Sequence, residues 1–176
     1  MDTTTPELIE TTRAAAMLRA DLHAAYPGVR FSVRKGTGTA CAWLRVTYTD
    51  GPTTRQVEQI IARYPAERYN QNTGGREPAP AQLVALDPAE PPRLVRFAVD
   101  GINVHREIGP AGRAAVAARI RQVAPGVSAL NPDGTLTDEI LTPEQAVQLG
   151  ATNYAHGIAQ VSDIAWPVFC GLDLTS

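Results

Sequence analysis

The chain has 176 residues, 44% of them hydrophobic and 19% charged, and a formal net charge of −2 at pH 7. These values are typical of one soluble domain with a hydrophobic core and argue against a second full domain. No apolar run is long enough for a membrane-spanning helix, and the polar, acidic start MDTTTPELIE is unlike a secretory signal. We therefore expect a cytoplasmic protein with no membrane partner.

Charge is distributed unevenly along the chain. Residues 1–121 contain all 16 basic and 12 of the 18 acidic residues, whereas residues 122–176 contain six acidic residues and no basic one. The first part is therefore about +4 and the last about −6. Such asymmetry indicates an anionic partner for the first part, a cationic partner for the last, or an acidic tail that docks on its own body. Fifteen of the basic residues are arginine, a bias that a GC-rich genome produces without selection for guanidinium chemistry.

The first predicted elements are a helix and a β-hairpin. Thr5, Pro6 and Glu7 have the pattern of a helix N-terminus, and an apolar stripe at helical spacing continues until Pro27 ends it. Apolar and polar residues then alternate over 29–34 and again over 41–48, which predicts two strands joined by the loop KGTGT.

A second strand and helix pattern follows. The segment DGPTTRQ at 50–56 combines a turn with a capping-box pattern and predicts a helix that Pro65 ends. Residues 65–92 are rich in Pro, Asn, Gly and Gln and predict a long connection with room for one short element. Alternation over 95–99 and 102–106 around Asp100-Gly101 predicts a second hairpin, and a helix is expected from Gly109-Pro110 to Pro125.

The remainder of the chain predicts a helical tail. The segment TPEQ at 142–145 is a capping box for a short helix, and Tyr154, Ile158, Val161 and Ala165 form one face of a further helix. We therefore predict an α+β fold in which two antiparallel hairpins share one sheet, in a ββα-ββα-like order, with helices packed on one face. The expected domains are an α+β core at 1–125, containing the long loop 65–92, and an acidic helical extension at 126–176 that packs on the core or on a partner.

The sequence PGVRFSV at 27–33, the strand ending in TYTDGPT at 47–53 and VEQII at 57–61 resemble one known family, the large polyvalent protein-associated domain family, class twenty-nine. The resemblance covers about residues 12–65. It implies an accessory domain of phage, plasmid or other mobile-element proteins and carries no catalytic residues over to this chain. The loop KGTGTA departs from the longer Ser/Gly-rich run of that family.

The first hairpin carries the candidate binding site. If its apolar positions face the helices, the opposite face presents cations around one aromatic ring, a combination with which sheets hold nucleic acid. The residues of this candidate site are Arg30, Arg34, Lys35, Trp43 and Arg45. The alternative is that these are solvated strand positions filled by arginine through base composition, with Trp43 packed beneath the long loop or the tail.

The sequence contains no catalytic or metal-binding motif. His23, His105 and His156 have no metal-ligand spacing, and Cys41 and Cys170 form neither a CxxC pair nor a disulfide framework. We therefore expect no catalytic residues, no metal and no cofactor.

Three functional hypotheses remain open. The first is a non-catalytic binding module of a mobile element, acting on nucleic acid or on a host protein in replication, transfer or counter-defence. The second is a small enzyme with a site between the first hairpin and the long loop, involving His105 or His156. The third is a homo-oligomer assembled through the apolar residues of the tail, namely Ile158, Ile164, Trp166, Val168 and Phe169.

Overall fold

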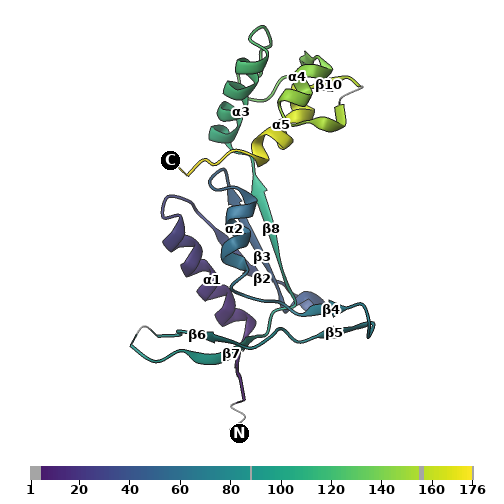
Figure 1. The fold of residues 1–176 in the computed structure, drawn as a ribbon. Helices are drawn as coiled ribbons and strands as arrows, with labels where there is room; N and C mark the ends of the chain where they lie inside the picture. The colour runs from purple at the N-terminus through teal and green to yellow at the C-terminus, as the bar shows by residue number, and fades with distance from the viewer. Residues whose placement is uncertain (1–4, 88, 155–156, 176) are drawn as a thin grey trace. The chain divides into compact units, whose positions relative to one another are not determined.

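The computed structural model describes residues 5–87, 89–154 and 157–175 and is α+β, as the sequence predicts (Figure 1). The chain forms two units, Met1–Tyr48 with Arg55–His105, and Thr49–Thr54 with Arg106–Ser176. Each unit has its own hydrophobic cluster. The helices and strands up to residue 107 are β1 (Glu7–Ile9), α1 (Thr11–Ala25), β2 (Ser32–Lys35), η1 (Gly38–Ala40), β3 (Trp43–Thr49), α2 (Thr54–Ile61), β4 (Arg68–Asn70), β5 (Gly75–Glu77), β6 (Gln82–Val84), β7 (Arg93–Phe97) and β8 (Gly101–Glu107).

The first helix begins later than the sequence predicts. Glu7–Ile9 forms strand β1, which pairs in parallel with β7 so that Ile9 lies opposite Phe97. Helix α1 begins only at Thr11, with Glu10 as its N-cap residue. The predicted N-cap at Thr5 is therefore wrong, because pairing with β7 satisfies the backbone of residues 7–9 and buries Ile9 completely. Local capping patterns carry no information about such a distant partner.

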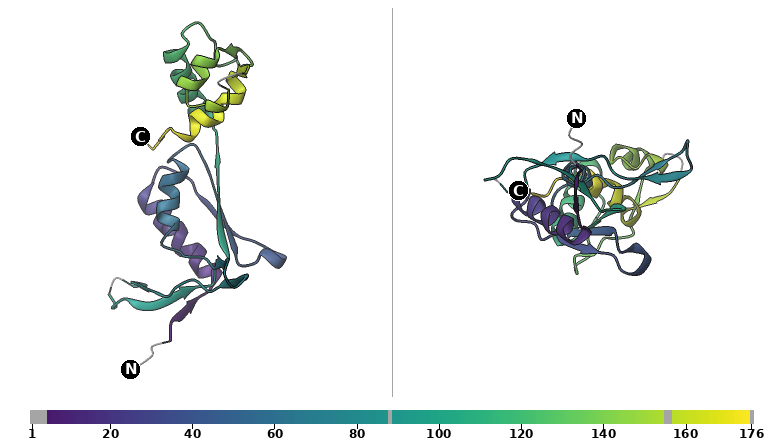
Figure 2. Two further views of the ribbon diagram at one scale, coloured as in Figure 1. Left: turned by 45° about the vertical axis from the view of Figure 1, so that its right-hand side comes forward. Right: turned by 90° about the horizontal axis from the view of Figure 1, so that it is seen from below.

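The first predicted hairpin is confirmed. Strands β2 and β3 pair antiparallel, with Val33 opposite Val46 and Arg34 opposite Arg45. Strand β8 lies on the other side of β3, which gives a sheet of order β2-β3-β8. The apolar side chains of β2 and β3 belong to one buried cluster with residues of α1 and α2, and both helices lie on the same side of these strands (Figures 1 and 2).

The second predicted hairpin is wrong. Strand β7 belongs to a separate sheet of order β1-β7-β6, whereas β8 belongs to the sheet with β3. The backbone changes its hydrogen-bonding partner between β7 and β8. The Ala98 amide donates to the Ile9 carbonyl, whereas the Asp100 amide donates to the Ala42 carbonyl, each at 2.9 Å. The expectation of two hairpins in one sheet is thus met only by the first hairpin, to which β8 adds a third strand.

The segment 65–92 is more ordered than the predicted long connection. Strands β4 and β5 form a small hairpin, with Tyr69 opposite Arg76. Strand β6 pairs antiparallel with β7, with Leu83 opposite Leu94. Three short strands therefore occupy a region that the sequence assigns to a loop, because strands of three residues leave almost no periodic signal.

The second unit is mainly helical. Helices α3 (Pro110–Val123) and α5 (Val161–Cys170) contribute Val116, Ile120, Ile164 and Phe169 to its core. The predicted capping box at Thr142 is confirmed. Of the predicted helical face, Val161 and Ala165 lie in a helix, whereas Tyr154 lies in a short 3-10 turn and Ile158 precedes a short strand; residues 155–156 lie outside the described residues. The elements of this unit are α3 (Pro110–Val123), β9 (Ile140–Leu141), α4 (Pro143–Gln148), η2 (Thr152–Tyr154), β10 (Ala159–Gln160) and α5 (Val161–Cys170).

The Asp50-Gly51 turn belongs to this second unit. The buried Arg106 guanidinium donates to the Asp50 carbonyl at 3.0 Å and to the Gly51 carbonyl at 2.8 Å. The same guanidinium donates to the Phe169 carbonyl at 3.0 Å and to the Leu172 carbonyl at 2.8 Å. Arg106 thereby links the Asp50-Gly51 turn to the end of α5, so the turn helps to hold the second unit together.

Candidate functional site

The face of the β2-β3-β8 sheet that points away from α1 and α2 carries polar and charged side chains. On β2 and β3 the alternation places Arg34 and Arg45 on this outer face, and both are exposed. Within the first unit, the exposed positions of β8 are Asn103 and His105. Because neighbouring strands lie about 4.8 Å apart, these side chains form one continuous surface.

Trp43 is held on this surface by a glycine of the neighbouring strand. A Cβ atom added to Gly101 would lie only 2.7 Å from two atoms of the indole ring, Cε3 and Cη2, so the ring packs directly over the Gly101 backbone. Only glycine permits so close an approach. Trp43 therefore has a defined position although it is only half-buried.

The cations of this face have no carboxylate partners within the described part of the chain. Arg34 and Arg45 are directly opposite each other in the β2-β3 register. Like charges directly opposite each other in such cross-strand pairs destabilise a sheet. Neither they nor Arg30 lie within 4.0 Å of any described carboxylate, although Arg13, Arg63, Arg76 and Arg93 elsewhere in this unit do.

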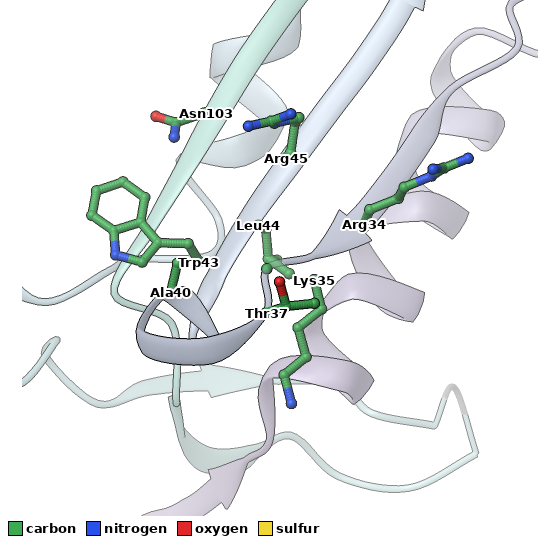
Figure 3. Close-up of a pocket in the computed structure, with 9 residues that line it drawn as sticks. Arg34, Lys35, Thr37, Ala40, Trp43, Leu44, Arg45 and Asn103 are labelled. Atoms are coloured by element: carbon green, nitrogen blue, oxygen red, sulfur yellow. The ribbon is translucent and has the colours of Figure 1, made fainter.

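A pocket of about 540 Å³ opens on the same face (Figure 3). Its walls include the Trp43 ring, the Arg45 and Asn103 side chains, and the β2-β3 loop at Thr37 and Ala40. In that loop Gly38 adopts a left-handed backbone conformation with φ 60°, which an L side chain rarely adopts. Of the two glycines in the loop KGTGT, Gly36 lines the pocket, and Gly38 provides the turn that follows it.

The five residues predicted from the sequence are placed differently. Arg34, Trp43 and Arg45 line the pocket from the outer face, with the two guanidinium groups directed apart (Figure 3). Lys35 also lines it, but its ammonium group points away from both arginines (Figure 3), because Lys35 is paired with the inward-facing Leu44. Arg30 is exposed, precedes β2 and does not line this pocket.

Sequence reasoning missed Asn103, Thr37 and Gly101. The period-two pattern of residues 102–106 does place Asn103 on the polar side of its strand. However, the sequence predicts a hairpin between that strand and residues 95–99, which separates Asn103 from Trp43. The observed pairing of β8 with β3 brings both into one pocket.

The structure also locates the residues of the other two hypotheses. His105 is exposed on β8, while His156 lies outside the described residues. No group of three or more His, Cys, Asp or Glu suited to a metal ion occurs among the residues that the structure describes. Cys41 and Cys170 are free thiols, and burial raises the pKa of Cys170.

Of the apolar tail residues, Ile164, Val168 and Phe169 are buried in the second unit, whereas Ile158 and Trp166 are exposed. Within the described ranges, none of the helices has the length and apolar character required to span a membrane.

The first unit is therefore a small α+β domain that presents a basic, aromatic sheet face with a pocket. Comparison with protein families identifies it further: residues 9–109 match the model of large polyvalent protein associated domain 29, and the chain belongs to that family. It thus carries an accessory domain of the polyvalent proteins of mobile elements. No curated protein and no solved structure matches the chain.

Proposed function

We propose that the outer face of β2-β3-β8 binds nucleic acid through the sugar-phosphate backbone. In this role the chain is a non-catalytic cytoplasmic module of a mobile element, used in replication, transfer or counter-defence. The observation that carries the proposal is the cross-strand pair of Arg34 and Arg45, two exposed like charges with no described carboxylate nearby. A phosphate beside each guanidinium group would offset this repulsion with charge-assisted hydrogen bonds.

The charge of the unit supports an anionic partner. Although the whole chain has a net charge of −2, the first unit holds 12 basic and 10 acidic residues and the second holds four basic and eight acidic. The first unit is therefore net positive. Several acidic residues of this unit form ion pairs with arginines that are not on the outer face, namely Glu7, Asp21, Glu67, Glu90 and Asp100. These carboxylates therefore do not neutralise Arg34 and Arg45.

Salt-dependent binding tests this proposal. Fluorescence anisotropy of labelled single-stranded and double-stranded oligonucleotides, measured at two or more salt concentrations, should show binding that weakens as salt rises. The double substitution Arg34→Gln, Arg45→Gln should weaken binding about tenfold or more and reduce the slope of log K against log salt by up to about 2, because each arginine contacts about one phosphate.

Arg55→Gln is the matched control. Arg55 is an exposed arginine on α2, whose helix covers the inner face of the same sheet, so its loss removes one arginine charge, as each single substitution of the pair does, but from the opposite side. We expect this variant to bind as the wild type does. Binding that is absent at low salt, or a double variant that behaves as Arg55→Gln does, would overturn the nucleic-acid proposal. A host protein with an acidic surface would then become the better candidate.

A further inference from the structure

We infer that the pocket beside Trp43 takes one unpaired base, so that the preferred ligand is a single strand. This inference rests on the proposed function and specifies its ligand. Its first support is the indole ring, which packs over Gly101 and also lines the pocket. The faces of bases in a duplex are already stacked on one another. A base must therefore leave the duplex before it can stack on this ring.

The size of the hollow fits such a ligand. The pocket of about 540 Å³ lies within the range of roughly 300–1,000 Å³ that small-molecule sites occupy. It is bounded by the sheet on one side and by the β2-β3 loop with η1 on another (Figure 3). This loop projects beside the Trp43 ring, so a continuous double helix laid on the sheet would not bring a base edge or face into the hollow.

Asn103 supplies hydrogen bonds for the edge of the base. It lies two residues after Gly101 on β8 and therefore on the same face as the glycine beneath the ring. The side chain of Asn103 lines the pocket and is exposed, and its carboxamide group makes no hydrogen bond to another residue in the described ranges. An amide offers both a donor and an acceptor, which matches the paired groups on a base edge and suits adenine best.

The arginines then hold the adjoining backbone. Arg45 follows Trp43 by two residues on β3, so its guanidinium projects from the same face, about 7 Å along the strand. Arg34, opposite Arg45 on β2, extends the cationic surface across the sheet. A base on Trp43 would thus lie beside phosphates held by Arg45 and Arg34, in the manner of single-strand binding platforms that combine stacking with electrostatic contacts.

Tryptophan fluorescence gives a direct test. The chain contains two tryptophans, Trp43 and Trp166. In a Trp166→Phe variant the emission reports on Trp43 alone. Titration with an unlabelled single-stranded oligonucleotide should quench it in proportion to binding, whereas a blunt duplex of the same sequence should quench it little. Parallel titrations with DNA and RNA strands and with oligo-A, oligo-C and oligo-T distinguish the sugar and the base.

Three substitutions complete the experiment. Trp43→Leu should weaken single-strand binding roughly five- to hundredfold, the effect of losing one stacked base, with little change for the duplex. Trp43→Phe should retain part of the affinity because it keeps a stacking ring, and it shows that the Leu effect is not misfolding. Asn103→Ala should reduce the difference between oligo-A and the other strands.

Failure of this inference and failure of the proposed function give different results. Two results would show that the single-strand inference is wrong while the nucleic-acid proposal stands. In the first, the Arg34→Gln, Arg45→Gln variant loses salt-dependent binding, but the wild type binds duplex as tightly as single strand. In the second, that variant again loses binding, but Trp43→Leu binds as the wild type does. If Trp43 emission in the Trp166→Phe variant is unchanged at saturating single strand, the base does not enter this pocket. If no oligonucleotide binds at low salt, both proposals are wrong.

Discussion

Arg106 and Arg45 both lie in predicted strands, but on opposite sides of the strand pattern: Arg106 is in phase with the apolar Ile102 and Val104, whereas Arg45 alternates with apolar neighbours. Arg106 is only 3% exposed, donates to four backbone carbonyls and has its guanidinium carbon 3.9 Å from the centre of the Phe169 ring. Arg45 is exposed on the outer face beside Trp43. Burial decides which of these two arginines stabilises the fold and which one is available to a ligand.

The buried hydroxyl of Tyr64 predicts how the stability of the fold depends on pH. This hydroxyl donates to the Asp21 carboxylate at 2.9 Å, and its pKa is raised above the ordinary value, first by burial and then by Asp21. Because the folded pKa exceeds the unfolded one, the stability contribution is fully present below about pH 10 and is lost as pH rises further, when tyrosine ionises in the unfolded chain.

We therefore expect the free energy of unfolding of the wild type to fall more between about pH 8 and about pH 11 than that of Tyr64→Phe. Urea unfolding at the two pH values measures both changes. All other side chains are the same in the two proteins, so their contributions cancel in the comparison. Equal losses in the two proteins would show that Tyr64 does not have a raised pKa.

At the scale of elements, the start of α3 depends on a turn that is distant in sequence. Asp50 Oδ1 accepts hydrogen bonds from the backbone amides of Gly109 at 2.7 Å and Gly112 at 3.0 Å. Asp50 itself has φ 56°, a left-handed conformation that Asp and Asn tolerate better than other non-glycine residues. The residue that caps α3 is therefore not its own N-cap residue, Gly109, which makes no side-chain cap.

Replacing Asp50 should destabilise this arrangement. Asp50→Ala removes the acceptor and places an alanine in the left-handed region, so we expect a loss of about 2 kcal/mol in the free energy of unfolding. Asp50→Asn keeps a side-chain oxygen and the backbone preference, so its loss should be less than half as large. Chemical unfolding followed by circular dichroism measures both. An alanine variant as stable as the wild type would show that Asp50 does not cap α3.

At the scale of the whole molecule, the chain builds two hydrophobic clusters from different residues. The first contains Leu18, Val33, Val46 and Val57, and the second contains Val116, Ile120, Ile164 and Phe169. The candidate site lies entirely in the first unit, whereas all six acidic residues after position 122 lie in the second. The charge asymmetry of the sequence therefore largely follows the division into units.

Separate clusters predict local effects of core substitutions. Ile164→Ala removes a fully buried side chain from the second cluster and should cost about 2–5 kcal/mol there. Amide hydrogen exchange should then show a larger loss of protection in α3 and α5 than in β2 and α1. Val46→Ala, in the first cluster, is the matched control and should give the reverse pattern. Equal losses across both units for either variant would contradict separate clusters.

The sequence by itself determined the local elements whose signals are complete within a short window. The first hairpin follows from alternation on both sides of a glycine-containing loop, and the family resemblance rests on residues in and just after that hairpin. The start of α2 and the capping box of α4 are likewise local patterns. Arg34, Trp43 and Arg45 were predicted to share a face because a period of two fixes the side from which strand residues project.

Only the tertiary structure decided which strands pair. The dipeptide Asp100-Gly101 has the composition of a hairpin turn, but the amide of Asp100 is satisfied by Ala42, and β8 continues along β3. Residues 7–9 form a strand for the same reason, since β7 offers them a partner almost ninety residues away in sequence. Backbone groups can be satisfied equally well by near or distant partners, and local sequence does not record the choice. That choice places Gly101 beneath Trp43 and Asn103 beside it, and thereby turns a basic strand face into a pocket.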